Sequence, residues 1–305
     1  MSNRPVVVVG DVVLDVLTLP QGPLRHGTDT PARVLPRSGG AGANTAAWLA
    51  AYGIETTLVT RVGDDALGRS ARAELEAAGV RCVWAVDRDR PTGVVVVLVD
   101  ETGERTMLPD RGANAGLTVA DVVDALGILA HFPGGRPHLH LSGYVLLDPA
   151  SRATGSAALA AARRLDWSTS VDPQAVGLIE RVGAAAFVRW VKGVDLILPN
   201  AAEAAALGGV ERLAAVVTAG VAVTDGAAGA RWVGADGSRY AAAADPIPAR
   251  DTTGSGDAFN AGLLAAWLAG RGPQAALEAG VAAGSAAAAG LGARPPRPAR
   301  SPAGP

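Results

Sequence analysis

The amino-acid sequence predicts an α/β fold in which helices cover both faces of a mainly parallel sheet. The first observation behind this prediction is that short runs rich in β-branched residues alternate with longer, helix-compatible segments, a pattern typical of parallel sheets. The second is size and composition: the chain has 305 residues, and 49% of them are hydrophobic. Such a chain can bury a substantial core, as one large domain or as two smaller ones.

The predicted strands are short apolar runs bounded by Gly, Asp, Pro or Asn, as buried strands usually are. They cover residues 6–9, 94–99, 139–141, 196–198 and 221–223. The predicted helices lie between several of these strands and cover residues 43–52, 70–78, 150–165, 179–191 and 201–207. A further helix is expected after Gly256, because residues 261–269 are rich in Ala and Leu.

Two regions interrupt this alternation, and a third follows it. Residues 16–37 carry four prolines, and residues 91–111 are expected to form a strand over 93–100 and a hairpin turn over 101–104. Both regions are expected to form a β-rich flap at the edge of the main domain, which spans residues 1–293. Residues 294–305 contain five prolines and three arginines without a large apolar residue, which predicts a flexible tail.

Charge and cysteine content exclude several classes of partner. The formal net charge is −2 and the sequence pI is about 6.1, so no basic field predicts binding to nucleic acid or to an acidic membrane surface. The single cysteine, Cys82, excludes an internal disulfide framework, and the four histidines lack the spacing of a zinc site. The apolar run at residues 6–9 is too short for a signal peptide. We therefore expect a soluble cytoplasmic protein with a small-molecule ligand.

The most informative stretch covers residues 251–260, where a turn of small residues lies between two carboxylates ahead of an apolar helix. The N–H groups at a helix N-terminus attract negative charge, and Gly254, Ser255 and Gly256 are small enough for a phosphate to approach the main chain. Asp257 would lie in the first helical turn with its carboxylate toward the same space. A phosphoryl group and an acceptor hydroxyl could meet at this point.

Two further motifs carry polar side chains that could hold an acceptor. In the segment GGAGAN at 39–44, glycines lead into an Ala-rich helix, and Asn44 is either a ligand of a polyhydroxy molecule or a helix N-cap. Asp11 and Asp15 follow the first strand, where open α/β sheets bind ligands. An Asp there either accepts hydrogen bonds from sugar hydroxyls or forms a turn. The dinucleotide and P-loop fingerprints are both absent.

Three more features each have a structural and a functional interpretation. Asn200 and Glu203 form a capping box at a helix start, or organise water around a Mg²⁺ carried by nucleotide phosphates. The segment TDGAAG at 224–229 is a turn after a strand, or a place for a nucleotide to lie. His138 and His140 share one face of a strand, where a core position is favoured over a metal site because no third ligand is nearby.

Five elements, in this order along the chain, closely resemble the pfkB family of ribokinase-like carbohydrate kinases. They are Asp15, GGAGAN at 39–44, NxxE at 200–203, TDGAAG at 224–229 and DTTGSGD at 251–257. The resemblance spans nearly the whole chain, to about residue 293, and implies a three-layer α/β/α domain with a small β-sheet lid formed by residues 16–37 and 91–111. It also implies ATP as the phosphoryl donor, Mg²⁺ and, as in many members, a monovalent cation such as K⁺.

The resemblance implies a role for each matching position. Asp257 is similar to the family's catalytic base, and Gly254, Ser255 and Gly256 are similar to its anion hole. The acceptor-binding positions are Asp15, Gly39, Gly40 and Asn44. The nucleotide-binding positions are Asn200, Glu203, Thr224, Gly226, Gly229 and Thr253, with Glu203 tied to Mg²⁺ through water. The monovalent-cation positions are Asp251 and Thr253, with the backbone of Ala287, Gly290 and Gly292.

The sequence departs from true ribokinases at two places. Ala41 stands where they usually carry Lys, and Ser142-Gly143 lies where they carry Glu, so ribose is not the expected acceptor. Arg111 lies near the expected lid. It either reaches an acceptor carboxylate, phosphate or carbonyl group, or it is an exposed, solvated side chain.

These observations predict an ATP-dependent kinase that transfers the γ-phosphoryl group to a primary hydroxyl of a sugar or sugar-like acceptor, with Asp257 accepting the hydroxyl proton. One alternative is a nucleoside kinase that acts on adenosine, pseudouridine or a similar ribosyl acceptor. The other is a catalytically silent binding protein on the same fold. A valine-rich lid edge at residues 94–97 predicts a homodimer formed through the lid.

Overall fold

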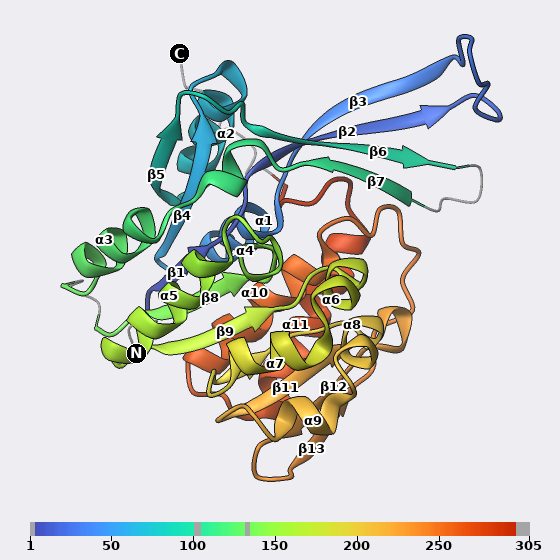
Figure 1. Cartoon of the computed structure of the whole chain (residues 1–305). Coiled ribbons are helices and arrows are strands. Elements are labelled where there is room, and N and C mark those ends of the chain that lie inside the picture. Colours follow the sequence, from blue (N-terminus) through green and yellow to red (C-terminus); the bar gives the residue numbers. More distant parts are fainter. Residues whose placement is uncertain (1–3, 101–104, 132–134, 297–305) are drawn as a thin grey trace, which may run out of the picture.

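The computed structural model describes residues 4–100, 105–131 and 135–296. Within these residues, a nine-stranded sheet lies between two layers of helices, and a separate four-stranded sheet projects from this body as a lid (Figure 1). The predicted three-layer α/β/α fold with a mainly parallel central sheet and a smaller sheet is thus confirmed. The hairpin turn predicted at residues 101–104 and the tail beyond residue 296 lie outside the described residues.

The central sheet is parallel except at one end. Its strand order is β13-β12-β11-β10-β9-β8-β1-β4-β5, and the pairs that β12 makes with β11 and β13 are antiparallel. The strands are β1 (Val6–Val9), β4 (Thr56–Gly63), β5 (Arg81–Asp87), β8 (His138–Ser142), β9 (Ser168–Asp172), β10 (Leu196–Ile197), β11 (Gly220–Thr224), β12 (Ala230–Gly234) and β13 (Arg239–Ala242). Four of the five predicted strands are β1, β8, β10 and β11, and the fifth is in the lid.

Two hydrophobic cores lie on the two faces of this sheet. Val7 and Val9 of β1 belong to one core, whereas Val6 and Val8 belong to the other. A strand that is buried on both faces has a continuous apolar sequence, as β1 does. The first core is covered by α3 (Val119–Leu129), α4 (Tyr144–Leu147), α5 (Arg152–Arg164), α6 (Val176–Val182), α7 (Ala184–Val191), α8 (Ala201–Ala206) and α9 (Val210–Ala214), and the second by α1 (Ala41–Ala51), α2 (Ala66–Ala77), α10 (Ser255–Leu268) and α11 (Gly272–Ala288).

The helices differ from the prediction at one glycine. The sequence predicts a single helix over residues 179–191, but Gly183 takes a φ of 83° and separates α6 from α7. A residue in the left-handed region ends a helix, and glycine adopts that conformation without strain. None of the helices in the described ranges combines the length and the apolar character that a membrane crossing requires.

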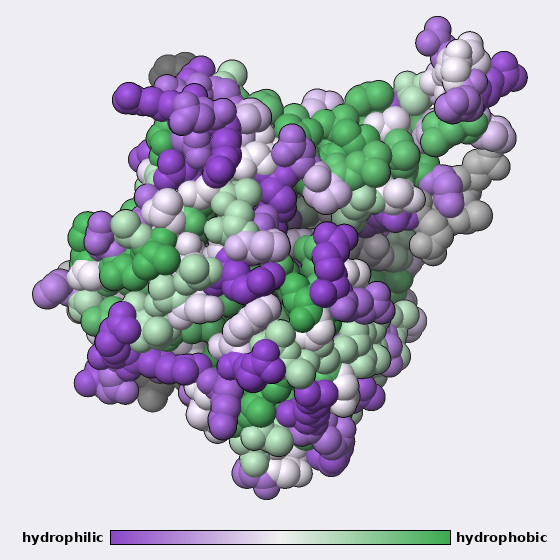
Figure 2. All heavy atoms as spheres, viewed as in Figure 1, coloured by the Kyte–Doolittle hydropathy of each residue, from purple (hydrophilic) through white to green (hydrophobic). Residues whose placement is uncertain are grey.

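The lid has the strand order β3-β2-β6-β7, and hydrophobic side chains gather on it (Figure 2). Its strands are β2 (Val13–Pro20), β3 (Ala32–Gly39), β6 (Gly93–Val99) and β7 (Arg105–Asp110). The prediction of a lid edge at residues 94–97 is wrong, because β6 pairs with β2 on one side and with β7 on the other. The backbone groups of residues 94–97 are therefore not open to a second copy of the chain.

His138 and His140 of β8 are core residues, as the sequence favours. His138 Nδ1 lies 2.9 Å from Ser168 Oγ, and His140 Nδ1 lies 2.8 Å from Ser170 Oγ, both on β9. Burial lowers the pKa of both imidazoles, which keeps them neutral. No group of three His, Cys, Asp or Glu residues within the described part of the chain is placed to hold a metal ion.

Candidate active site

Residues of the candidate site, with Asp172 as one that the sequence did not predict, meet at the carboxyl ends of five neighbouring strands. Asp11 follows β1, Ser142 ends β8, Asp172 ends β9, Asn200 follows β10 and Thr224 ends β11. The strands are adjacent in this order, so their ends form a row with about 4.8 Å between neighbours. Ligands of open α/β sheets bind at this edge. The acceptor motifs lie at the β1 end of the row, and the nucleotide motifs lie at the β11 end.

Asp257 lies in the first turn of α10, enclosed by protein, with part of its surface facing a cavity. Gly254 precedes the helix with a φ of 75°, and a Cβ there would lie 2.5 Å from the carbonyl oxygen of Ala293. Asp257 Oδ2 accepts a 2.9 Å hydrogen bond from Asn44 Nδ2. Burial raises the pKa of Asp257 well above its usual range; the Asn44 hydrogen bond opposes this, and the charge of Asp172 adds to it. A carboxylate with a raised pKa is suited to accept a proton near neutral pH.

Asn44 lies inside α1, whose N-cap is Gly40, so its interpretation as the cap is wrong. Arg294 Nε donates to Asn44 Oδ1 at 3.3 Å, Nη2 donates to the Gly39 carbonyl at 3.1 Å, and Nη1 pairs with Glu74 at 3.2 Å. With its oxygen held by Arg294, the Asn44 amide presents Nδ2 to Asp257. The tail predicted from residue 294 onward therefore does not include Arg294, whose side chain is 10% exposed.

The turn before Asp257 has the features of an anion site. Helix α10 begins at Ser255, so unpaired N–H groups of its first turn lie beside Gly254. The Ser255 hydroxyl is buried and has no hydrogen-bond partner among the described residues. A Cβ on Gly256 would meet no atom within 4 Å, so the backbone is open to a ligand at this point. A phosphate oxygen would satisfy these donors, which are costly to leave unpaired.

The acceptor positions line a cavity of about 850 Å³ between the lid and the central sheet. Asp15 comes from the lid strand β2, not from the main sheet, and faces this cavity together with Gly40, Asn44 and Asp257. Burial raises the pKa of Asp15 to about 6, with a further contribution from the Asp11 charge. Gly39 leaves room for this carboxylate, because a Cβ there would lie 2.1 Å from Asp15 Oδ2.

Arg111 also lines the cavity, and it is not the solvated side chain of the alternative interpretation, because only 20% of it is exposed. Its guanidinium carbon lies 5.2 Å from the centroid of the Tyr144 ring, and Nη1 donates to the Tyr144 carbonyl at 3.4 Å. Nε lies 3.8 Å from Asp148 Oδ2. This Nε is buried and has no hydrogen-bond partner in the described ranges.

The nucleotide positions lie outside this cavity, at the ends of β10 and β11. Asn200 and Glu203 form the predicted capping box, in which Glu203 N–H donates to Asn200 Oδ1 at 2.8 Å and Asn200 Nδ2 donates to Glu203 Oε1 at 2.7 Å. Thr224 pairs with Asn200 in a β-bridge, and a side chain on Gly226 would meet only open space. Gly229 packs closely on β13, because a Cβ there would lie 2.1 Å from a carbonyl oxygen of that strand.

Glu203 and Asp172 fit a Mg²⁺ that arrives with a nucleotide. Both are buried, with exposed fractions of 3% and 8%. Burial raises the pKa of Glu203, and the charge of Asp172 raises it further; burial is also the main reason that the pKa of Asp172 is raised. A divalent cation stabilises such buried carboxylates, and Mg²⁺ keeps several of its own waters while it does so.

The residues around Asp251, where the resemblance implies a monovalent cation, hold a guanidinium group in this structure. Asp251 Oδ1 accepts hydrogen bonds from Arg105 Nη2 at 3.0 Å, Thr253 N at 3.0 Å and Thr253 Oγ1 at 2.6 Å, and Oδ2 accepts one from Gly292 N at 3.0 Å. The Ala287 carbonyl accepts the N–H of Gly290 at 2.9 Å. The positive charge beside Asp251 is thus a guanidinium from lid strand β7.

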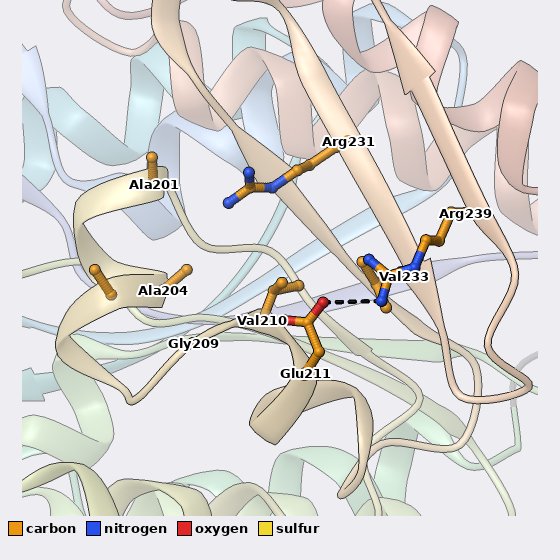
Figure 3. Close-up of a pocket in the computed structure, with 9 residues that line it drawn as sticks. Ala201, Ala204, Gly209, Val210, Glu211, Arg231, Val233 and Arg239 are labelled. Carbon is orange, nitrogen blue, oxygen red and sulfur yellow. Dashed lines mark hydrogen bonds and ion pairs between the residues drawn. The ribbon is translucent and has the colours of Figure 1, made fainter.

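A second cavity, of about 330 Å³, lies between α8, α9 and the β12–β13 hairpin (Figure 3). Arg239 is paired there with Glu211 at 2.9 Å, and Arg231 lies across from Ala201. Arg231 and Val233 project from β12 toward α8 and α9, the face opposite α10. This cavity shares no lining residue with the larger one.

The chain is similar to sugar kinases of other organisms. The chain is 32% identical over 292 residues to an ATP-dependent ribose-1-phosphate kinase of Halopiger xanaduensis, which covers 93% of this chain and 90% of that protein. It is 32% identical over 278 residues to a fructokinase of Klebsiella pneumoniae, which covers 86% and 84%.

Solved structures share the fold. An adenosine kinase from Sinorhizobium meliloti superposes with a TM-score of 0.82 at 24% identity, covering 96% of each chain. A putative ribokinase II from E. coli, in complex with ATP and Mg²⁺, superposes with a TM-score of 0.81 at 20% identity, covering 95% of this chain and 94% of that one. The model of the pfkB family carbohydrate kinases matches residues 3–300. The chain therefore belongs to the pfkB family of carbohydrate kinases, which are phosphotransferases with an alcohol group as acceptor.

Proposed function

We propose that this protein transfers the γ-phosphoryl group of ATP to a primary hydroxyl of a sugar or sugar-like acceptor. The observation that carries the proposal is the juxtaposition of the Asp257 carboxylate with the open N-terminus of α10 and the unpaired Ser255 hydroxyl. A base and an anion site thus meet at one helix terminus, between the acceptor cavity and the nucleotide motifs. The similarity to kinases of ribose 1-phosphate and fructose supports the same reaction class.

In the proposed mechanism, Asp257 accepts the proton of the acceptor hydroxyl as its oxygen attacks the γ-phosphorus. The N–H groups at the start of α10 and the Ser255 hydroxyl donate to the charge on the transferring group. Asp15 accepts hydrogen bonds from acceptor hydroxyls, and the second N–H of Asn44 Nδ2 is free to orient the reacting oxygen. Mg²⁺, held through water at Glu203, would neutralise charge on the nucleotide phosphates. The lid excludes water that would compete for the phosphoryl group.

An ATP-consumption screen tests this proposal. Free sugars, sugar phosphates, sugar acids and nucleosides are each incubated with the protein, ATP and Mg²⁺, and ADP release is measured. We expect acceptor-dependent ADP release with at least one sugar class. If no acceptor raises ADP release above the ATP-only rate, the proposal is wrong and the silent-protein alternative is favoured.

A nucleoside kinase is the second candidate, because one wall of the cavity is apolar. Leu178, Val182, Ala186 and Trp190 of α6 and α7 line it, and a nucleobase could pack there. The fold shared with the adenosine kinase is compatible with this alternative. Adenosine and pseudouridine in the same screen decide it: turnover on a nucleoside that exceeds turnover on every sugar would favour the nucleoside kinase.

We also propose that Arg105 takes the place of the monovalent cation expected near the anion site, so that turnover does not depend on K⁺. The ion pair of Arg105 with Asp251 supports this, since it neutralises the carboxylate two residues before Thr253. Hydrogen bonds from Thr253 and Gly292, together with the Arg105 charge, lower the pKa of Asp251 despite its burial, so the carboxylate stays charged.

We propose that two copies of the chain associate through the outer face of the lid sheet, and not through the edge of one of its strands. Side chains alternate along strands, so Val95 and Val97 face the cavity while Val94 and Val96 lie on the opposite face. Leu108, paired with Val96, is 54% exposed on that outer face. We propose that it packs against a second copy of the lid. Light scattering should give a dimer mass at micromolar concentration, and a monomer mass would contradict this.

We place the reaction in the cytoplasm, where ATP is available and Cys82 stays a free thiol.

A further inference from the structure

The cavity that contains Asp257 extends well beyond the groups that would hold a sugar hydroxyl. Its volume of about 850 Å³ is in the range that accommodates a drug-sized ligand. At one end it is lined by the carboxylates of Asp11, Asp15 and Asp257. Its other wall comes from α5, α6 and α7, on which none of the mechanistic groups lies.

This other wall carries guanidinium groups beside its apolar side chains. Arg111 leads into it from the end of lid strand β7, Arg152 comes from α5, and Arg181 comes from α6. The cavity thus has one set of carboxylates around the reacting hydroxyl and a second set, of three cations, away from it; Asp110 and Asp148 also line the cavity, and Asp148 pairs with Arg111. The first set can accept hydrogen bonds from hydroxyl groups, whereas the second set is suited to bind an anion.

Arg111 has unused donors. A guanidinium carries five N–H donors, and Arg111 spends one on the Tyr144 carbonyl at a long 3.4 Å. Its Nε is buried and unpaired in the part of the chain that the structure describes. The carboxylate of Asp148 is 3.8 Å away, beyond hydrogen-bond distance. Asp148 thus supplies Arg111 with an ion pair but not with a hydrogen bond, and a neutral ligand with hydroxyl groups alone would bring no charged acceptor within hydrogen-bond distance of the guanidinium.

Arg152 and Arg181 complete the cationic wall in different ways. Arg152 is held in place, since Nε donates to the Leu146 carbonyl at 3.0 Å and its guanidinium carbon lies 4.6 Å from the centroid of the Trp190 ring. Arg181 is exposed and makes no hydrogen bond or ion pair with another described residue, so it is free to close on a ligand. A rigid cation and a free one thus line the same cavity as Arg111.

We propose that the phosphoryl acceptor is anionic: it carries a phosphate or carboxylate group at the end opposite its reacting hydroxyl, and Arg111 binds this group with the help of Arg181. The inference rests on the proposed function, because it names the acceptor class of the same site. Planar, forked recognition of a phosphate or carboxylate is the task for which arginine is suited.

Matched acceptor pairs test the inference. Neutral sugars such as ribose, glucose and fructose are compared with their 1-phosphates for the phosphate arm, and glucose is compared with gluconate for the carboxylate arm. We expect kcat/KM to be highest for a charged member. The arm that contains it identifies the source of the anion. A neutral sugar or a nucleoside as the best acceptor would overturn the inference and leave the kinase proposal intact, whereas no turnover on any acceptor would overturn both.

Three variants locate the anion subsite. Arg111→Met and Arg181→Met should each lower kcat/KM for the charged acceptor more than for its neutral partner, by about 10- to 100-fold for Arg111, mainly through KM. Arg181→Met is the safer variant for folding, since Arg181 bonds to no described residue. Arg69→Met, on the exposed face of α2, is the matched control and should change neither rate. Equal losses on the charged and neutral acceptors in both variants would contradict an anion subsite.

Discussion

Single carboxylates carry most of the chemistry proposed for this site, and their neighbours set their protonation. Asp15 lies on the lid, where burial and the Asp11 charge raise its pKa to about 6 and the Arg294 charge opposes them. Asp257 lies on α10, where burial raises its pKa further. The acceptor-binding group and the base should therefore lose their function at different pH values.

Asp15 should make acceptor binding weaken in acid. Above a pH of about 6 its carboxylate is charged and accepts two hydrogen bonds from sugar hydroxyls; below this pH it is protonated and accepts them poorly. We expect KM for the acceptor to rise about tenfold per pH unit below 6 in the wild type. In Asp15→Asn, KM should be high and much less dependent on pH. A wild-type KM that stays constant between pH 7 and pH 5 would contradict the role of Asp15.

Asp257 should lower the stability of the protein at neutral pH. Because its pKa is raised in the folded state, the folded protein keeps this proton to a higher pH than the unfolded chain does. The contribution is therefore fully favourable below pH 4 and is lost as pH rises through the folded-state pKa. Asp257→Asn should raise Tm at pH 8 by a few degrees, at about 2–4 °C per kcal/mol. The difference should shrink toward pH 4. A Tm at pH 8 below that of the wild type would contradict this.

The motif residues could be predicted from the sequence because each works within a few positions of its neighbours. Asn200 and Glu203 form their capping box three residues apart, and Asp257 belongs to the turn that holds it. Arg294 could not be predicted, because it contacts Asn44 across 250 positions and lies in a proline-rich segment typical of tails. The pairing of Arg105 with Asp251, 146 positions apart, could not be predicted for the same reason.

Among the elements, some strands that are buried on both faces could be predicted from the sequence, and others could not. The all-valine β1 has an unambiguous sequence, whereas β4 buries Thr56, Thr57 and Thr60 among its apolar residues. Helix α11 has no wide apolar stripe, because it packs on α10 through small residues: a Cβ at Gly280 would lie 2.8 Å from the Phe259 ring. Close approach of this kind depends on the partner helix, which local sequence patterns do not show.

The lid strand β7 is joined to the anion-site turn by the pair Arg105–Asp251, and this contact should be measurable. Arg105→Met removes the positive charge beside Asp251, so we expect kcat to fall about tenfold and added K⁺ to restore part of it. The wild type should turn over equally in K⁺ and in tetramethylammonium buffers. Arg69→Met again serves as the control. Strong activation of the wild type by K⁺ would contradict the proposed substitution of the cation by Arg105.

In the whole molecule, the strand order of the central sheet places the parts of the reaction in a line. Asp11 lies at the end of β1 beside the acceptor groups, the buried carboxylate of Asp172 at the end of β9, and the nucleotide motifs at β10 and β11. The lid covers the acceptor end, and α10 brings Asp257 and its anion site between the two. The mainly parallel sheet could be predicted from the alternation of elements, but the cationic wall of the cavity could not, since Arg152 and Arg181 belong to no motif.

Turnover of Asp257→Asn, measured with the best acceptor of the screen alongside the affinity for ATP, tests the central claim most directly. Asn keeps the size of Asp257 and an oxygen that accepts from Asn44 Nδ2, so the fold and the nucleotide site should be retained. We expect kcat to fall by about 10²- to 10⁴-fold with the Kd for ATP changed by less than about threefold. A kcat within about fivefold of the wild-type value would show that Asp257 is not the base.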